Sequence, residues 1–275
     1  MKRKIRIFAM IICFLIFVAS MTYVVKEVII NPYQNNKAVN EAKELLVDDE
    51  DEADVEESDG GKNKNAKERL KKYEELAKQN SDVKGWIQID DTKIDYPVLQ
   101  SEKDNFEKSY YHYLHYDWRG NSTKLGSIAL LKGIDILKDK TFVLIGHNID
   151  YPPCMFHDIL KYSDLDFYKE HAIVKFDTIY EKMDWVVFSV LKVQTGDKTF
   201  DILQSSFQDD KQYMEHIGTM RSRSLIKNDI PIDKDDKILV LYTCSYETNE
   251  SRTAIVARKI RGDEKVSNYV KNATN

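Results

Sequence analysis

The sequence predicts a mainly β domain, closed as a barrel or sandwich, with peripheral helices and an N-terminal transmembrane helix. Eight runs rich in Ile, Val, Leu and aromatic residues lie between residues 81 and 262, separated by polar turn residues. The chain has few glycines and no internal repeat. One long uncharged run precedes this region near the N-terminus. These observations favour a single β domain behind a membrane segment.

The charge is spread unevenly along the chain. Residues 2–6 carry four bases, and residues 48–59 carry nine acids. Residues 60–275 hold 34 bases and 34 acids, so the formal net charge of -5 arises near the N-terminus. A neutral domain without a basic stripe argues against nucleic acid as a partner.

The uncharged run, residues 7–25, predicts the transmembrane anchor. Its 19 residues, at about 1.5 Å each, nearly cross a hydrocarbon core of roughly 30 Å. The basic flank, residues 1–6, predicts a cytoplasmic N-terminus and an extracellular main domain on a single-pass membrane protein. A cleaved signal peptide is the alternative, because Val18-Ala19-Ser20 resembles a cleavage site. The uncleaved anchor is favoured, since signal-peptide cores typically span about 7 to 15 residues.

Composition divides the rest of the chain into four parts. Residues 26–64 include the acidic run and predict a solvated stalk or linker. Residues 65–80 carry apolar side chains at helical spacing and predict an amphipathic helix that docks on the domain. Residues 81–262 form the predicted main domain, and residues 263–275 a loose polar tail.

The predicted domain contains short strands interrupted by two helical stretches. The helical stretches lie around residues 155–162 and 209–221. The strand candidates are residues 85–89, 92–100, 126–131, 141–147, 172–179, 185–193, 237–244 and 252–260.

Cys244 ends a strand that is apolar on both faces, and this position indicates a thiol at a rim. A buried cysteine is ordinarily inert, but the polar run from Ser245 begins immediately after this one. If the following loop is a hairpin centred near Thr248, Arg252 faces Cys244 across the strand pair. Its guanidinium can then stabilise a thiolate or an oxyanion. A solvated arginine at a strand end is the alternative.

A thiol nucleophile needs a proton acceptor and donor, and His147 is the candidate because it closes another apolar strand after Gly146. His112 and His115, with Asp117, have a spacing that suits a metal but lack a clear fourth ligand. We therefore expect no metal site there.

Several motifs in order resemble the signature of the sortases, and more closely that of class B. The resemblance covers residues 81–261. It is carried by Gly85-Trp86-Ile87, Ile94-Asp95-Tyr96-Pro97-Val98-Leu99-Gln100, Gly146-His147-Asn148, Met155-Phe156, Phe188-Ser189-Val190, Arg223-Ser224-Leu225-Ile226, Leu241-Tyr242-Thr243-Cys244 and the Arg252 that opens Arg-Thr-Ala-Ile-Val-Ala-Arg.

The resemblance implies an eight-stranded sortase β-barrel. It also implies a cysteine transpeptidase on the outer face of the cell membrane of a Gram-positive bacterium. Such an enzyme cleaves a C-terminal sorting signal of a secreted protein and passes the acyl group to an amine of the peptidoglycan precursor. Carried over, Cys244 is the nucleophile, His147 the general acid and base, and Arg252 the group that binds the oxyanion. No cofactor is implied.

The resemblance also implies substrate contacts, namely Asn105, Asn148, Tyr242 and Thr243. Tyr242 stands where relatives often have a small hydroxyl residue, which predicts a reshaped groove. Three other interpretations stay open: a cysteine peptidase that only hydrolyses, a sorting-signal-binding module without turnover and, more distantly, an adhesin. Cys154 and Cys244 are the only cysteines outside the membrane segment, and we expect both to be free thiols, because a disulfide would consume the nucleophile.

Overall fold

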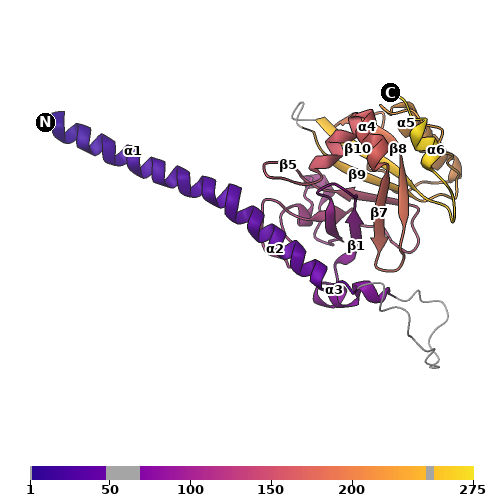
Figure 1. Cartoon of the computed structure of the whole chain (residues 1–275), viewed down its shortest axis with the longest axis horizontal. Coiled ribbons are helices and arrows are strands. Elements are labelled where there is room, and N and C mark those ends of the chain that lie inside the picture. Colours follow the sequence, from indigo (N-terminus) through magenta and orange to yellow (C-terminus); the bar gives the residue numbers. More distant parts are fainter. Residues whose placement is uncertain (1, 48–68, 246–250) are drawn as a thin grey trace.

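The computed structural model describes residues 2–47, 69–245 and 251–275. Its centre is a closed β-barrel with helices around it and one long helix projecting from it (Figure 1). The strand order is β1-β2-β3-β4-β9-β10-β8-β7. The barrel strands are β1 (Val83–Gln88), β2 (Asp95–Leu99), β3 (Ile128–Leu130), β4 (Thr141–Ile145), β7 (Ile173–Thr178), β8 (Asp184–Gln194), β9 (Ile238–Cys244) and β10 (Ser251–Lys259).

All eight strand candidates become barrel strands, which confirms the predicted mainly β fold. Most neighbours pair antiparallel, but β2–β3 and β4–β9 are parallel. The parallel contact between β4 and β9 matters for the site because it brings the carboxyl ends of both strands to one rim. Inside the barrel, Phe142, Phe176 and Trp185 meet edge-on or tilted with ring centroids about 6 Å apart.

The N-terminal helix continues beyond the predicted membrane segment. Helix α1 (Lys2–Val25) passes through a π-helical turn, η1 (Lys26–Ile30), into α2 (Asn31–Glu44). One helix of the described residues, 3–44, is long and apolar enough by length and composition to cross a membrane. Residues 26–44 are thus helical, whereas the sequence predicted a solvated stalk over 26–64. Residues 48–64 lie outside the described residues.

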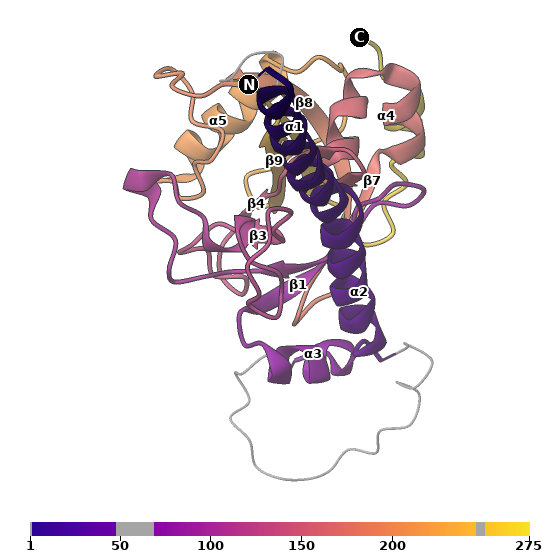
Figure 2. The same ribbon diagram turned by 90° about the vertical axis from the view of Figure 1, so that its left-hand side faces the viewer.

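Helix α2 packs against the barrel instead of standing apart from it (Figures 1 and 2). Ala38 and Ala42 are buried on its inner face, and the Trp118 indole N–H donates to the Ala38 carbonyl oxygen at 2.6 Å. At the carboxyl end of α2, Lys43 pairs with Asp95 at 2.5 Å. The stalk prediction missed this because it weighed the acidic run and not the small residues that recur at helical spacing.

Other boundaries also differ from the expectation. The helix expected over 65–80 is a short pair, η3 (Lys71–Tyr73) and α3 (Glu74–Gln79), and residues 65–68 lie outside the described residues. Tyr73, Leu76 and Ala77 of this pair are buried, so it docks on the domain as predicted.

The C-terminal tail is ordered rather than loose. Its helix, α6 (Ser267–Lys271), buries Val270, and Lys227 bridges Thr274. Arg258, fully buried in β10, binds Glu264 through two hydrogen bonds of 2.8 and 2.7 Å. This buried ion pair anchors the start of the tail.

The two predicted helical stretches become η6 (His157–Ser163) and α5 (Asp210–Ser222). Helix α4 (Leu165–His171) and the two strands of a hairpin, β5 (Asn148–Asp150) and β6 (Pro153–Met155), were not predicted either. Two short turns, η4 (Phe106–Lys108) and η5 (His112–Leu114), precede β3.

Candidate active site

Strands β9 and β10 bring Cys244 and Arg252 together. The register pairs these residues directly across the two strands. Opposed residues project to the same face, and both side chains are half-buried at the end of the ladder. Their neighbours Thr243 and Thr253 are buried on the other face. This is the predicted pairing, although Thr248, the expected hairpin centre, lies outside the described residues.

The parallel pairing of β4 and β9 brings His147 to the same rim. Ile145 is level with Tyr242, and the Gly146 N–H donates to the Tyr242 carbonyl oxygen at 3.2 Å. Continuing this register by two residues sets His147 level with Cys244. The three predicted catalytic residues therefore lie on adjacent strand ends of one barrel rim.

Gly146 is required at this rim by close packing. A Cβ there would lie 2.6 Å from Ile128 Cδ1 and 2.7 Å from Phe156 Cδ2, closer than carbon atoms approach. The backbone can therefore leave β4 beside β9 only if this residue lacks a side chain.

A backbone carbonyl fixes the tautomer of His147. The imidazole Nε2 lies 2.8 Å from the Leu114 carbonyl oxygen, which can only accept a hydrogen bond. Nε2 therefore carries the hydrogen, and Nδ1 is the nitrogen free to take up a proton. Burial lowers the pKa of His147 below its usual 6.5, although the carbonyl opposes this shift. The neutral imidazole is thus favoured near pH 7.

The β5–β6 hairpin follows His147 and is held by contacts with His157 of η6. Asn148 is buried, and its Oδ1 accepts from Nδ1 of His157 at 2.8 Å. Asp150 also lies 3.3 Å from the same nitrogen. The resemblance implied that Asn148 contacts substrate. Its side chain is buried against η6, where the hydrogen bond to His157 holds the hairpin, and its contact with substrate stays a prediction.

The structure places the other three implied substrate contacts in different surroundings. Thr243 is buried and its hydroxyl donates to the Gly146 carbonyl oxygen at 2.8 Å, so it ties β9 to the end of β4. Asn105 accepts from the Lys108 N–H at 3.1 Å and caps the η4 turn. Tyr242 is half-buried on the face of Cys244, where burial raises its pKa to about 12, opposed by the nearby Arg252 charge. Tyr242, two residues before Cys244 on β9, projects to the same face of the strand as Cys244.

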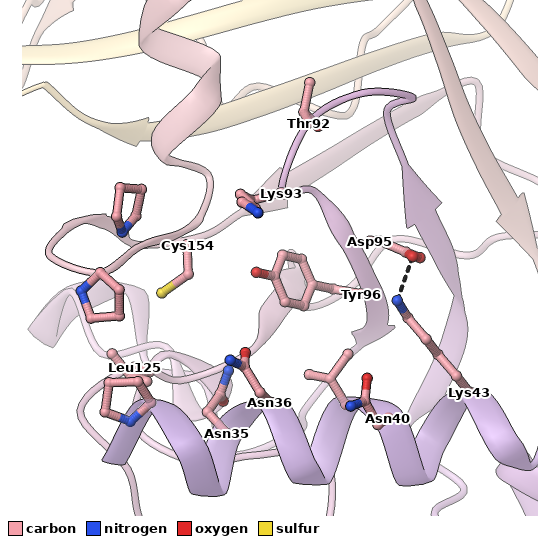
Figure 3. A pocket seen from close by; sticks show the side chains of 14 residues that line it. Asn35, Asn36, Asn40, Lys43, Thr92, Lys93, Asp95, Tyr96, Leu125 and Cys154 are labelled. Carbon is pink, nitrogen blue, oxygen red and sulfur yellow. Dashed lines mark hydrogen bonds and ion pairs between the residues drawn. The ribbon is translucent and has the colours of Figure 1, made fainter. Parts of the chain in front are cut away.

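Cys154 lies in different surroundings, against the N-terminal helix. It lines a cavity of about 510 Å³ between α2, β2 and the β5–β6 hairpin. Figure 3 shows its sulfur facing Asn35 and Asn36 of α2, with Tyr96 beside it. Burial raises the pKa of this thiol to about 11. Cys13, Cys154 and Cys244 are all free thiols in the structure.

Sequence reasoning missed the Leu114 carbonyl, because a backbone acceptor carries no side-chain signal. The histidines weighed as metal ligands pack among aromatic rings. His112 stacks on Tyr116 with centroids 4.3 Å apart, and His115 stacks on Tyr110 at 5.3 Å. Within the described part of the chain, no three His, Cys, Asp or Glu residues form a metal-binding group.

Comparison with known proteins gives the family. The sequence matches the family model of the sortase domain over residues 87–260. Sortase B of Staphylococcus aureus (strain NCTC 8325 / PS 47) is 30% identical over 196 residues, covering 69% of this chain and 75% of that protein.

A Staphylococcus aureus sortase B-substrate complex superposes with a TM-score of 0.62 at 29% identity, covering 69% of this chain and 85% of that chain. Sortase B from B. anthracis in complex with AAEK2 superposes with a TM-score of 0.69 at 26% identity, covering 84% and 98%. The chain therefore belongs to the sortase family of cysteine transpeptidases, and within it to class B.

Proposed function

We propose that this chain is a membrane-anchored transpeptidase that cleaves a C-terminal sorting signal of secreted proteins and transfers the acyl group to an amine of a cell wall precursor. The observation that carries the proposal is the convergence of Cys244, His147 and Arg252 on one barrel rim. The membership of the sortase family supports the reaction type. The solved structure of a relative with its substrate supports a peptide substrate at this fold.

The first half-reaction forms a thioester at Cys244. Its Sγ attacks the scissile carbonyl carbon while Nδ1 of His147 takes the thiol proton. The Arg252 guanidinium donates hydrogen bonds to the oxyanion that develops on the carbonyl oxygen. The carbon–nitrogen bond then breaks, and the proton on His147 passes to the departing amine. This leaves a neutral imidazole and an acylated sulfur.

The second half-reaction transfers the acyl group. An acceptor amine attacks the thioester carbonyl, and His147 takes a proton from the attacking nitrogen. The carbon–sulfur bond breaks, an amide forms, and the proton returns to the Cys244 thiolate. Dividing one amide exchange into two steps lowers the barrier of each.

The location follows from the N-terminal helix. Its apolar part is long enough to span a bilayer, and bases precede it. We propose a cytoplasmic N-terminus and a catalytic domain on the extracellular face. Anchoring confines enzyme, secreted substrate and acceptor to one surface and raises their effective concentration.

The test uses the full chain in lipid nanodiscs with fluorogenic peptides that carry sorting signals from the same genome. We expect cleavage that is lost in Cys244→Ala, His147→Ala and Arg252→Ala. Lys271→Ala, an exposed change on α6, is the matched surface control and should cleave normally. Cleavage that persists in Cys244→Ala would overturn the proposal.

An added amine separates transfer from hydrolysis. With a peptide amine present, we expect a new amide product to accumulate at the expense of the free acid. If no amine competes with water, the chain is a hydrolytic peptidase, and if no peptide is cleaved, it is a binding module.

A further inference from the structure

The catalytic domain touches the end of the apolar helix. The Lys124 ammonium donates to the Tyr23 hydroxyl at 3.2 Å and to Glu27 Oε1 at 2.7 Å, and it lies 5.1 Å from the Tyr23 ring centroid. Tyr23 is within the proposed membrane span, two residues from its end at Val25. Tyrosines at this position lie at the level of the lipid headgroups. The loop that carries Lys124 is therefore held at that level too.

This loop leads directly to the catalytic histidine. Lys124 and Gly126 are two residues apart, at most roughly 7 Å along the chain. Gly126 packs so closely that a Cβ would lie 2.6 Å from the Leu114 carbonyl oxygen. That same oxygen accepts from His147 at 2.8 Å. The carboxyl end of α1 is thus connected to the His147 imidazole through Lys124, Gly126 and the Leu114 carbonyl oxygen.

The connection between helix and barrel is rigid. No loop separates α1 from α2 in the described residues 2–44. The barrel is fixed to α2 by the buried Ala38 and Ala42, and by an ion pair of 3.0 Å between Arg119 and Glu41. The height of the catalytic rim above a membrane is therefore set by the helix and not by a flexible tether.

The β5–β6 hairpin projects from the barrel toward the side on which α1 leaves it (Figure 1). Tyr151 at its tip is 75% exposed, whereas the next most exposed large apolar side chain outside the N-terminal helix, among the described residues, is Phe106 at 49%. An exposed tyrosine with an apolar ring and a polar hydroxyl suits the bilayer interface. Two prolines follow it and add further apolar surface.

We propose that the β5–β6 hairpin is a membrane-docking surface, with the ring of Tyr151 placed among the phospholipid headgroups of the outer leaflet. The rim with His147 and Cys244 then opens beside the lipid surface. This inference rests on the proposed anchoring of α1, and it adds a partner for the catalytic domain itself: the phospholipid bilayer. Peptide bonds and amines held close to the bilayer are the substrates such a rim reaches.

Fluorescence quenching by lipids tests this contact. The three native tryptophans, at 86, 118 and 185, are buried, so Tyr151→Trp adds one exposed indole to the full chain. The chain is placed in phosphatidylcholine and phosphatidylglycerol vesicles whose lipids are brominated either near the headgroup or deep in the acyl chain. We expect roughly a twofold loss of the added emission with shallow bromine, and a smaller loss with deep bromine.

Asn268→Trp on α6 is the matched control, because α6 lies on the barrel side remote from α1 (Figure 1). Its added emission should be unaffected by either lipid. Equal emission of the two variants in brominated vesicles would overturn the docking proposal, and an unchanged melting temperature checks that Tyr151→Trp folds.

The quenching experiment tests the docking surface separately from the proposed transpeptidase activity. Quenching needs no substrate, so a chain that is quenched but forms no thioester keeps the docking surface and loses the chemistry. A chain that floats with vesicles but shows no quenching keeps the anchor and loses the docking surface. A chain that does not float with vesicles contradicts both the anchor and the docking surface.

Discussion

Two regions of the molecule each contain one cysteine: the barrel rim at the end of β9, and the interface between the β5–β6 hairpin and α2. On the rim, Cys244 is half-buried at the end of β9, opposite Arg252 and level with His147. In strand β6 of the hairpin, Cys154 faces a cavity that α2 also lines, and burial raises the pKa of its thiol to about 11. The two thiols are chemically identical. We expect the thiol at a strand end beside a cation to act as the nucleophile, and the thiol buried at the α2 interface to stay inert.

The largest effect should separate the two cysteines. Cys244→Ala removes the proposed nucleophile, and we expect peptide cleavage to fall by about 10⁴-fold or more. Cys154→Ala removes a buried thiol that no step uses, so cleavage should stay within about twofold and the melting temperature should fall slightly. The measurement is the cleavage rate of the full chain in nanodiscs. Similar losses in both variants would show that the comparison between the regions is wrong.

A smaller effect distinguishes the cations of the two regions. Arg252→Ala removes the proposed oxyanion donor, and we expect a loss of about 10² to 10³ in the cleavage rate. Lys43→Ala removes the partner of Asp95 on the α2 side, at an exposed site, and should leave the rate unchanged. Steady-state kinetics of both variants give the comparison. A normal rate in Arg252→Ala would remove the guanidinium from the mechanism.

The pH dependence of acylation should report the burial of His147. Burial lowers its pKa, so the imidazole stays neutral, and able to accept the thiol proton, to a pH below its usual 6.5. The rate should therefore begin to fall only as the pH drops through this lowered value. Pre-steady-state acylation measured from pH 4 to pH 8 gives the acidic limb. An acidic limb above pH 6.5 would contradict the burial of this side chain.

The smallest effect concerns the α2 interface. Trp118→Phe keeps most of the buried ring but loses the N–H that donates to the Ala38 carbonyl oxygen. We expect the free energy of unfolding to fall by about 1 kcal/mol, with little change in the cleavage rate. Thermal and urea unfolding check the first part. A loss of activity without a loss of stability would mean that α2 takes part in catalysis.

The residues predicted a mainly β domain, closed as a barrel or sandwich, because its strands are apolar runs with clear ends, and the resemblance to the sortases implied the barrel. The opposition of Cys244 and Arg252 followed from the short segment between two such runs, and the rim position of His147 from a strand that ends in Gly146. These features depend on local patterns, which a single sequence records directly.

The elements that were missed depend on tertiary contacts. Strands β5 and β6 have three residues each, too few for a period to be visible. Helix α2 looked like part of a polar stalk because only Ala38, Ala42 and a few neighbours face the barrel. Asn148 and Thr243 seemed available to substrate, whereas the structure buries both beside the rim. The orientation of His147 depends on the Leu114 carbonyl, 33 residues away in the sequence.

The most direct test of the three-residue rim is to trap the acyl-enzyme. The full chain in nanodiscs is mixed with a sorting-signal peptide, quenched in acid and digested, and the fragments are weighed by mass spectrometry. The account predicts the acyl fragment on the segment that contains Cys244, and its disappearance when a peptide amine is added before the quench. An acyl group on Cys154, or no adduct although the peptide is cleaved, would contradict it.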